Sequence, residues 1–251
     1  MGLRYSYELI DIEVLGLPAI AVGALLEDAR RRGLNGVNVT HPCKQLVMTH
    51  LDALDPTAAR VGAVNTVRFD NGRAVGHNTD WFGFEEGFKR GLPGAALDRV
   101  LLVGAGGAGA AVAHALRALG VHELTVVDVD LARAETLASC VNGRTGGPQD
   151  LAQLLAAADG VVNATPVGML GHPGLPVPAE LLRPPLWVAD VIYRPLETEL
   201  LRAARLAGCR TLDGGGMVVF QAAQAFQIFT GVEPDGERML SHFQELACAA
   251  P

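Results

Sequence analysis

Short apolar runs and longer segments with an apolar residue every three or four positions follow one another through the second half of the chain. The runs predict buried strands, and the longer segments have the period of helices. Strands are expected at 99–103, 124–127, 160–163 and 186–191, and helices at 108–119, 131–139 and 197–207. Such alternation is typical of a parallel, doubly wound sheet, so we predict an α/β domain of the Rossmann type.

The first half of the chain predicts a smaller α/β domain. Segments 63–69 and 73–77 flank Asp70-Asn71-Gly72, and they predict a hairpin because Asn-Gly tolerates the positive φ values of a tight turn. Strands are also expected at 5–12 and 34–39, a helix at 19–32 ending at Gly33, a short helix that starts at Thr40 and carries Lys44, and a longer helix at 80–90.

Residues that break regular structure separate these two patterns. Gly91-Leu92-Pro93-Gly94 indicates a domain boundary, and the glycines within 140–148 predict a loop. Helices expected at 217–230 and 235–248 would return to the first domain. The predicted organisation is therefore a substrate-binding and catalytic domain at 1–88 and 214–251, with a nucleotide-binding domain at 89–213 between its two parts.

Composition and charge exclude several classes of protein. The chain has 251 residues, 49% of them hydrophobic, which is enough to bury the cores of two modest domains. Its net charge of -7 and the lack of a Lys/Arg run disfavour nucleic acids and anionic membranes as partners. No apolar run approaches the ~20 residues of a membrane span, and no signal peptide is apparent. We expect a soluble monomer or homodimer in the cytoplasm.

The cysteines do not predict a metal site or a disulfide framework. Cys43, Cys140, Cys209 and Cys248 are scattered without CxxC spacing. Reduced thiols in the cytoplasm are the simplest interpretation. No metal is expected, and a zinc alcohol dehydrogenase is excluded because the histidines and cysteines show no clustering of ligands.

The segment Gly104-Ala105-Gly106-Gly107-Ala108-Gly109 follows an apolar run and opens a predicted helix. Backbone amides at a helix N-terminus can face a pyrophosphate, and glycines leave no Cβ in the way. A GxGxxG pattern alone is weak evidence, but here the strand, the helix and an acidic residue at the end of the next strand are all present. We predict a dinucleotide site formed by Gly104, Gly106, Gly107, Ala108 and Gly109.

Asp128, at the end of that next strand, bears on the choice of cofactor. It can accept hydrogen bonds from the adenosine ribose hydroxyls, whereas a 2′-phosphate would meet the like charges of Asp128 and Asp130. NAD is therefore expected, with NADP as the alternative. Two readings stay open: the aspartates could cap the next helix, a role that suits Asp130, and Arg133 could neutralise a phosphate.

Lys44 is the candidate base. Oxidation of a hydroxyl needs a base for the O–H proton while hydride leaves for nicotinamide, and a lysine near an acid can serve. Considered alone, a lysine is most often a solvated surface residue. Six motifs occur in order around it: Asn38 to Lys44, Gly62 to Thr66, Gly76-His77-Asn78-Thr79-Asp80, the glycine loop, Asn163 to Met169, and Gly216 to Gln221. Together they resemble the shikimate dehydrogenase family across nearly the whole chain.

The resemblance implies a role for each matching residue. Lys44 and Asp80 correspond to the catalytic pair, in which the lysine exchanges the proton of the reacting hydroxyl and the aspartate orients or polarises that group. Two alternatives to substrate binding stay open. Asn65 could be a simple turn amide, and Tyr193 could be a partly buried aromatic at a strand end. The implied substrate ligands are Thr40, Asn65, Gln221 and Tyr193, and the implied cofactor contacts are Thr165, Met169 and Gly216 beside the glycine loop, Asp128 and Arg133.

Within the family, the chain is most similar to the NAD-dependent quinate/shikimate dehydrogenases. The NADP enzymes of the shikimate pathway, which serves aromatic amino acid biosynthesis, carry an Asn-Arg-Thr-like loop where this chain has Asp128-Val129-Asp130. The implied reaction interconverts shikimate or quinate and their 3-dehydro ketones. NADP-dependent shikimate dehydrogenase and aminoshikimate dehydrogenase stay open, and His77 marks the branch without being a proposed base.

The start of the chain departs from the family. Family members begin with a strand and a Ser-x-Ser-Pro segment whose hydroxyls hold the substrate carboxylate, and nothing before Tyr5 matches it. The substrate domain is therefore expected to be incomplete at its N-terminus: a recorded start downstream of the true one is favoured over a cut chain or a rearranged domain. A non-catalytic relative that binds NAD or a metabolite is the alternative function that this departure motivates.

Overall fold

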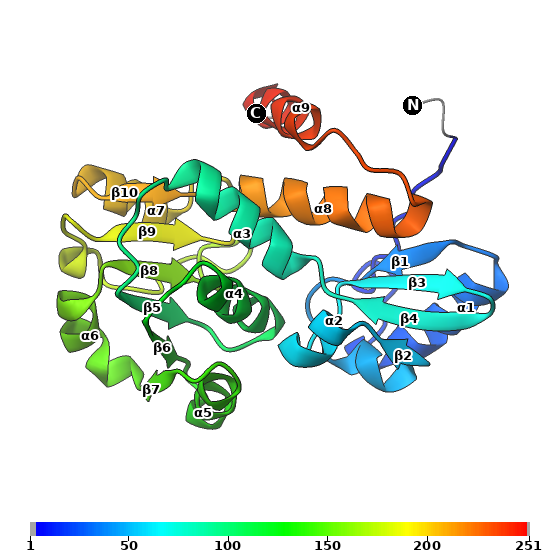
Figure 1. The fold of residues 1–251 in the computed structure, drawn as a ribbon, viewed down its shortest axis with the longest axis horizontal. Helices are drawn as coiled ribbons and strands as arrows, with labels where there is room; N and C mark the ends of the chain where they lie inside the picture. The colour runs from blue at the N-terminus through cyan, green and yellow to red at the C-terminus, as the bar shows by residue number, and fades with distance from the viewer. Residues whose placement is uncertain (1–3, 250–251) are drawn as a thin grey trace.

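The computed structural model describes residues 4–249, which form two α/β units side by side (Figure 1). Two helices, α3 (Asp80–Gly91) and α8 (Gly215–Thr230), cross each other and link the units. The last helix, α9 (Gly236–Ala249), packs on α8, and Glu237 on it pairs with Arg90 of α3 at 2.9 Å. The predicted α/β class with two sheets is confirmed.

The larger sheet has six strands, all parallel, in the order β10-β9-β8-β5-β6-β7. The chain enters at β5, builds outward to β7, crosses back to β8 and builds outward to β10. The order reverses between β5 and β8, and ligands of such sheets bind at the carboxyl ends of the strands beside this point. The strands are β5 (Arg99–Val103), β6 (Glu123–Val127), β7 (Arg144–Gly146), β8 (Gly160–Asn163), β9 (Trp187–Asp190) and β10 (Arg210–Leu212).

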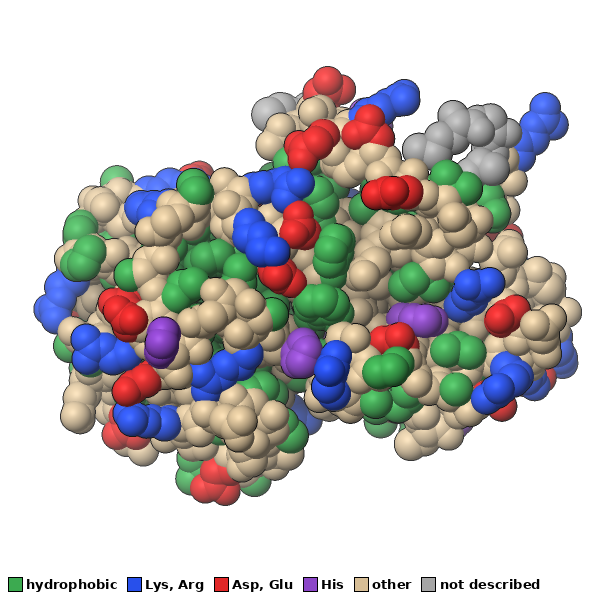
Figure 2. Space-filling model, in the orientation of Figure 1, with side chains coloured by type: hydrophobic (Ala, Val, Ile, Leu, Met, Phe, Trp, Pro, Cys, Tyr) green, Lys and Arg blue, Asp and Glu red, His purple; other side chains and the backbone are tan. Residues whose placement is uncertain are grey.

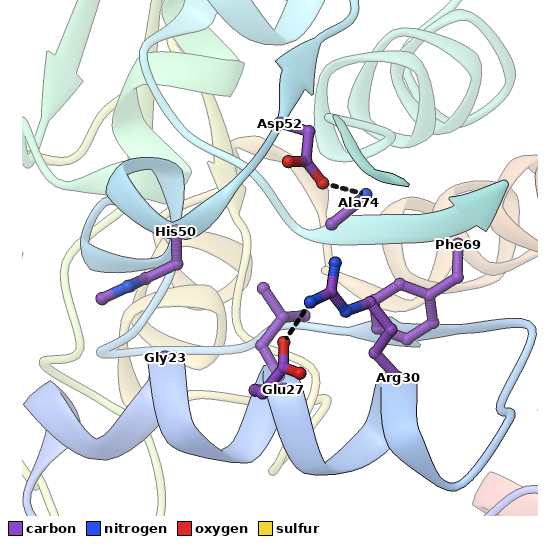
Figure 3. Close-up of a pocket in the computed structure, with 8 residues that line it drawn as sticks. Gly23, Glu27, Arg30, His50, Asp52, Phe69 and Ala74 are labelled. Atoms are coloured by element: carbon purple, nitrogen blue, oxygen red, sulfur yellow. Dashed lines mark hydrogen bonds and ion pairs between the residues drawn. The ribbon is translucent and has the colours of Figure 1, made fainter. Parts of the chain in front are cut away.

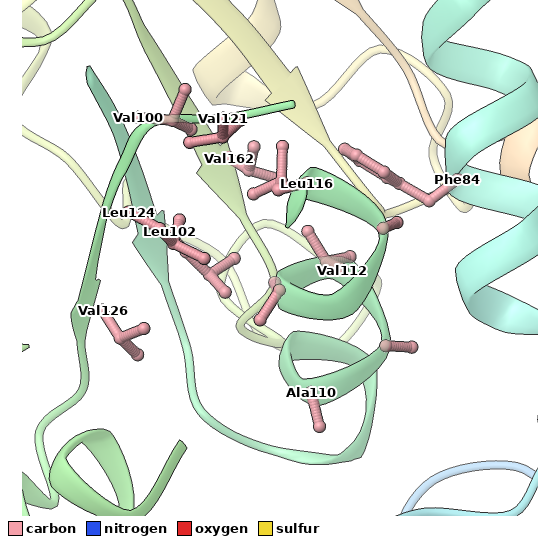
Figure 4. Packing of buried hydrophobic residues seen from close by; sticks show 14 of the residues in the cluster. Phe84, Val100, Leu102, Ala110, Val112, Leu116, Val121, Leu124, Val126 and Val162 are labelled. Carbon is pink, nitrogen blue, oxygen red and sulfur yellow. The ribbon is translucent and has the colours of Figure 1, made fainter. Parts of the chain in front are cut away.

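Helices cover both faces of this sheet. Val100 and Leu102 of β5 pack into the cluster under α3, α4 (Gly107–Ala118) and α5 (Leu131–Cys140), as Figure 4 shows for α4. Leu101 and Val103 point to the other face, where α6 (Leu151–Ala157) and α7 (Glu199–Leu206) lie. Burial on both faces requires strands that are apolar throughout, which is why the sequence pattern located these strands well.

The smaller sheet has the order β1-β3-β4-β2. The predicted hairpin is present, with Asn71 at φ 49° and Gly72 at φ 77°, and Gly33 follows α1 at φ 72° as expected for a helix end. The core between this sheet and its helices includes Val22, Val47 and Val67. The elements are α1 (Val22–Arg31), β1 (Gly36–Asn38), β2 (Ala53–Leu54), α2 (Pro56–Val61), β3 (Thr66–Asp70) and β4 (Arg73–His77).

The prediction of a strand at residues 5–12 is wrong. These residues join neither ladder, because alternation of side chains makes a strand only where a neighbouring backbone is available to pair with it. Side chains hold the segment instead: the Tyr7 hydroxyl donates to Asn38 Oδ1 at 3.2 Å, and Glu8 pairs with Arg32.

Two further local predictions need correction. The segment 140–148 is not wholly a loop, because Arg144–Gly146 pair with the free edge of β6 as β7 despite their polar character. Lys44 does not lie on a short helix: residues 41–45 form turns, and a 3-10 helix begins only at Leu46. Pro42 and the turn together place Lys44 at the end of β1 rather than on a helix face.

Candidate active site

Lys44 and Asp80 form a buried ion pair where the two units meet. Lys44 Nζ lies 2.6 Å from Asp80 Oδ2, and the two side chains are 18% and 6% exposed. Asp80 is the first residue of α3, where the helix dipole favours a carboxylate, and its backbone N–H donates to Asn78 Oδ1 at 3.0 Å. The sequence prediction left open whether these residues meet, and the structure brings them together.

Asn65 is the centre of the polar network around this pair. Its Nδ2 amide lies 3.0 Å from Asp80 Oδ1, 2.9 Å from Thr79 Oγ1 and 3.3 Å from Gln221 Oε1. Its Oδ1 accepts from Thr79 N at 2.8 Å and from Thr66 Oγ1 at 3.1 Å. The two hydrogens of the Asn65 amide face three acceptor oxygens, so the amide is held firmly. These oxygens have more lone pairs than the amide can fill, so they can still accept a hydrogen bond from a ligand hydroxyl.

Gln221 and Thr79 complete the network, and Thr79 was missed by the sequence analysis. The Thr79 hydroxyl donates to Gln221 Oε1 at 3.4 Å, although these residues are far apart in the chain. Gln221 comes from α8, so the helix crossing brings it to the pair. The available signal for Thr79 was its position directly before Asp80, because threonine is a favoured residue at the N-cap of a helix.

Thr40 and Tyr193 lie outside this hydrogen-bonded group. Thr40 is exposed at the end of β1, and its hydroxyl donates to the neighbouring His41 carbonyl at 3.4 Å. Tyr193 follows β9 and is 45% exposed, which agrees with the alternative of a partly buried aromatic at a strand end. Asn38 has a structural role, because its amide donates to Thr66 Oγ1 at 3.1 Å and ties β1 to β3.

The glycine loop has the shape that a dinucleotide site requires. Gly104 has φ 107°, and a Cβ there would lie 2.8 Å from the Ala164 carbonyl group. A Cβ on Gly109 would lie 2.0 Å from Gly104 O, whereas a Cβ on Gly106 would meet nothing within 4 Å. Gly106 therefore faces open space at the N-terminus of the twelve-residue helix α4, where a pyrophosphate can approach the backbone amides.

The aspartates after β6 are already engaged. Asp128 Oδ2 accepts from Ala105 N at 2.6 Å, and its Oδ1 accepts from Asp130 N at 2.9 Å, so Asp128 braces the glycine loop. Each oxygen keeps a lone pair for a ribose hydroxyl. Asp130 caps α5 by accepting from Ala132 N and Arg133 N, which bears out the capping alternative for this residue. Arg133 Nε lies 3.7 Å from Asp130 Oδ2.

A second buried network shapes the loop after β8. Asn163 Nδ2 donates to Asp190 Oδ1 and to Val167 O, both at 3.1 Å, while its Oδ1 accepts from Thr165 Oγ1 at 2.7 Å. This network fixes Thr165 beside Gly104, and Met169 follows in the same loop. Gly216 lies on α8 against Gly87 of α3, where the two helices cross.

Asp190 predicts a dependence of stability on pH. Burial raises the pKa of Asp190 to about 6, against hydrogen bonds from Thr198, Ile192 and Asn163 that lower it. The folded protein then keeps this proton up to about pH 6, while the unfolded chain releases it near 3.8. The contribution of this site to the free energy of unfolding therefore falls by about 2 kcal/mol as pH rises from 4 to 6. Denaturant titrations of the wild type and Asp190→Asn should diverge over this interval, and parallel curves would contradict the assignment.

Other cavities lie away from the Lys44–Asp80 pair, one beside α1 and one between α8 and α9. A cavity of about 210 Å³ lies between α1 and the smaller sheet (Figure 3), but Arg30 there is paired with Glu27 at 2.7 Å and Asp52 accepts from Ala74 N. The face in Figure 2 mixes acidic and basic side chains without a patch of one sign. Within residues 4–249, no cluster of three potential metal ligands occurs, and none of the helices is long and apolar enough to span a membrane.

Comparisons with known proteins agree with this geometry. Residues 1–67 match the family model of the shikimate dehydrogenase substrate-binding domain, and residues 88–168 match that of shikimate/quinate 5-dehydrogenase. The chain is 60% identical to the NADP(+) shikimate dehydrogenase of Streptomyces avermitilis, over 99% of this chain and 88% of the relative. It is 50% identical to the NAD(+) quinate/shikimate dehydrogenase of Corynebacterium efficiens, over 98% and 89%.

Solved structures give the same result. Quinate dehydrogenase from Corynebacterium glutamicum in complex with NAD superposes with a TM-score of 0.82 at 48% identity, covering 89% of this chain and 82% of that one. Shikimate 5-dehydrogenase from Thermus thermophilus, in complex with NADP(H) and shikimate, gives 0.80 at 38% identity, covering 93% and 90%. The chain thus belongs to the shikimate dehydrogenase family and is an NAD(P)-dependent dehydrogenase acting on CH–OH groups.

Proposed function

We propose that this chain oxidises the ring hydroxyl of shikimate or quinate to the 3-dehydro ketone with NAD, and catalyses the reverse reduction. The buried Lys44–Asp80 pair, 2.6 Å long and placed beside the glycine loop, is the observation that carries the proposal. In the oxidation, Lys44 Nζ accepts the proton of the reacting hydroxyl when it is in its neutral amine form. The Asp80 carboxylate orients the lysine and the hydroxyl, and the lysine returns the proton in the reduction.

The residues of the nucleotide site fit a dinucleotide. Gly106 leaves the N-terminus of α4 open, and the loops held by Asp128 and Asn163 border it. When bound there, the nicotinamide supplies the acceptor for the hydride that leaves the carbinol carbon, so alcohol and NAD give ketone, NADH and one proton. The proposed cofactor residues are Gly104, Gly106, Gly107, Ala108, Gly109, Asp128, Arg133, Thr165, Met169 and Gly216.

The proposed substrate site extends from the pair to both units. Asn65 and Gln221 are held by each other and by Thr79, so their orientation is set before a ligand arrives. Such preorganised amides suit a ring that carries several hydroxyls. Thr40, exposed at the end of β1, and Tyr193, exposed after β9, are the further proposed ligands.

NAD is the proposed cofactor because the carboxylates of Asp128 and Asp130, which follow β6, would repel a 2′-phosphate bound beside them. NADP is the second candidate, because the Streptomyces avermitilis and Arthrobacter relatives are named NADP(+) enzymes and Arg133 lies near Asp130 in the first turn of α5.

We expect kcat/KM with NAD to exceed that with NADP on the order of tenfold. Asp128→Asn keeps one acceptor oxygen for Ala105 N. This variant should bring the kcat/KM values for NAD and NADP closer together, mainly through the KM for each dinucleotide. Asp130→Ser, which keeps the helix cap, should change the ratio less, and a wild-type preference for NADP would contradict the proposal.

The experiment that tests the reaction is formation of NADH at 340 nm with quinate, shikimate or aminoshikimate as substrate and either dinucleotide. Turnover of quinate or shikimate with NAD supports the proposal. Turnover of aminoshikimate alone would assign a different substrate. Binding of NAD without turnover of any of the three would favour the non-catalytic alternative.

A further inference from the structure

The glycines of the nucleotide loop meet different surroundings. A Cβ on Gly104 would strike the loop after β8, and a Cβ on Gly109 would strike Gly104 itself. A Cβ on Gly106 would point into open space, as expected where a pyrophosphate approaches. Gly107 differs from all three, because a Cβ on it would point toward the unit that contains the smaller sheet.

The contact on that side is Lys44. A Cβ on Gly107 would lie 3.3 Å from Lys44 Cβ and 3.6 Å from both Lys44 Cδ and Ala63 Cβ. Cβ contacts of 3.3 Å are tight, so either the lysine stem or the start of α4 would have to shift by a few tenths of an ångström. The first turn of the nucleotide helix thus rests directly on the stem of the candidate base.

Neither the backbone at Lys44 nor the helix α4 can move away from this contact easily. The Lys44 carbonyl accepts from Val64 N at 2.8 Å, and Ala63 and Val64 are fully buried. On the opposite side, Ala111 and Val112 of α4 are fully buried in the core. His114 of α4 also packs edge-on against Trp81, the residue after Asp80, with ring centroids 5.9 Å apart. An added methyl group would therefore press on the Lys44 stem, where Cδ can turn aside but Cβ, the nearest atom, moves only together with the lysine backbone.

We propose that Gly107 is a positioning residue for Lys44: its missing side chain lets α4 seat against the lysine stem and sets the reach of Nζ to Asp80. The inference rests on the proposed function, in which Lys44 exchanges the substrate proton. Gly107 occupies an x position of the GxGxxG pattern. The inference adds to its proposed place in the cofactor loop a role in holding Lys44. Small errors in the placement of a catalytic group are costly, since about 1 Å can lower a rate by about 10²-fold.

The test compares Gly107→Ala and Gly107→Val with Gly106→Ala in the full chain. For Gly107→Ala we expect kcat to fall about threefold to tenfold, and for Gly107→Val by at least about fiftyfold. The Kd for NADH, measured by fluorescence titration, should change less than about threefold in both. Gly106→Ala should instead weaken the Kd for NADH by more than about tenfold, because its Cβ would enter the space of the pyrophosphate.

Wild-type kcat in both Gly107 variants, or a loss of NADH affinity that matches the loss of kcat, would overturn the inference. If Gly107→Val does not fold, Gly107→Ala alone decides. Crystal structures give a readout that does not depend on activity: Lys44 should move away from its 2.6 Å contact with Asp80 in the variants, and an unchanged pair would overturn the positional claim. Lys44→Ala, assayed in parallel, tests the proposed function separately.

Discussion

Replacing Lys44 by alanine is expected to lower kcat by about 10³-fold, because a positioned general base contributes about 10²–10⁴ to such a reaction. Lys44 lies 2.6 Å from Asp80, and its partner is held in turn by Asn65. Without the amine, no other cationic or basic side chain is hydrogen-bonded to Asp80 among the described residues. The measurement is steady-state turnover with quinate or shikimate at saturating NAD, together with the Kd for NADH, which should stay nearly unchanged.

The chain provides its own control for this variant. Lys89 is the only other lysine in the sequence, and it lies on α3, the helix that starts with Asp80. Its ammonium pairs with Glu85 at 2.7 Å on the surface, where such pairs contribute little. Lys89→Ala removes the same charge and should keep wild-type turnover. Partial rescue of Lys44→Ala by an added primary amine would support the role in proton transfer, and wild-type turnover in Lys44→Ala would refute it.

Most of the nucleotide unit was predictable from the sequence, but α6, β7 and β10 were missed. Strands such as Arg99–Val103 are buried on both faces, so their apolar runs are continuous and end at clear breaks. Strand β7 was missed because it lies at the edge of the sheet, where Arg144 and Thr145 remain exposed and only pairing with β6 defines it. Residues 5–12 show the converse: they alternate like a strand, but no backbone lies beside them to pair with.

The site was predictable as a set of residue types but not as an arrangement. The motifs named Lys44, Asp80, Asn65 and Gln221, and the structure brings these four into one network. Thr79 was given no role by the pattern, and Gly107 was assigned to the cofactor alone. Their partners, Gln221 and Lys44, are supplied by crossings between units that no local spacing encodes.

The crossing of α3 and α8 explains how residues far apart in sequence reach one site. Asp80 begins α3, and Gln221 lies in the first half of α8. The helices approach closely because glycines line the contact: a Cβ on Gly83 would lie 2.4 Å from Met217 O and 2.8 Å from Gln221 N. Gly87 faces Gly216 and Met217 one turn further along. The spacing of these backbones therefore sets the distance between the Asp80 and Gln221 side chains.

Gly83→Ala is expected to lower the free energy of unfolding by about 3 kcal/mol, because the new methyl group would overlap backbone atoms that cannot rotate away. The helices must then separate, so Gln221 should withdraw from Asn65 and Thr79, and KM for the substrate should rise in the protein that remains folded. Denaturant titration measures the first effect and steady-state kinetics the second. Kinetic assays under conditions below the unfolding transition keep the effect on KM separate from the loss of stability.

Gly91→Ala is the matched control, since it makes the same change near the end of the same helix. A Cβ there would meet only Leu212 Cδ1, at 2.3 Å, and this methyl group is the far end of a flexible side chain that can turn away. Gly91 is also exposed, so the protein should unfold at nearly the wild-type denaturant concentration. Equal destabilisation by the two variants would mean that loss of glycine in α3, rather than the helix crossing, governs the effect. A stable Gly83→Ala with wild-type KM would show that the helices can separate without disturbing the site.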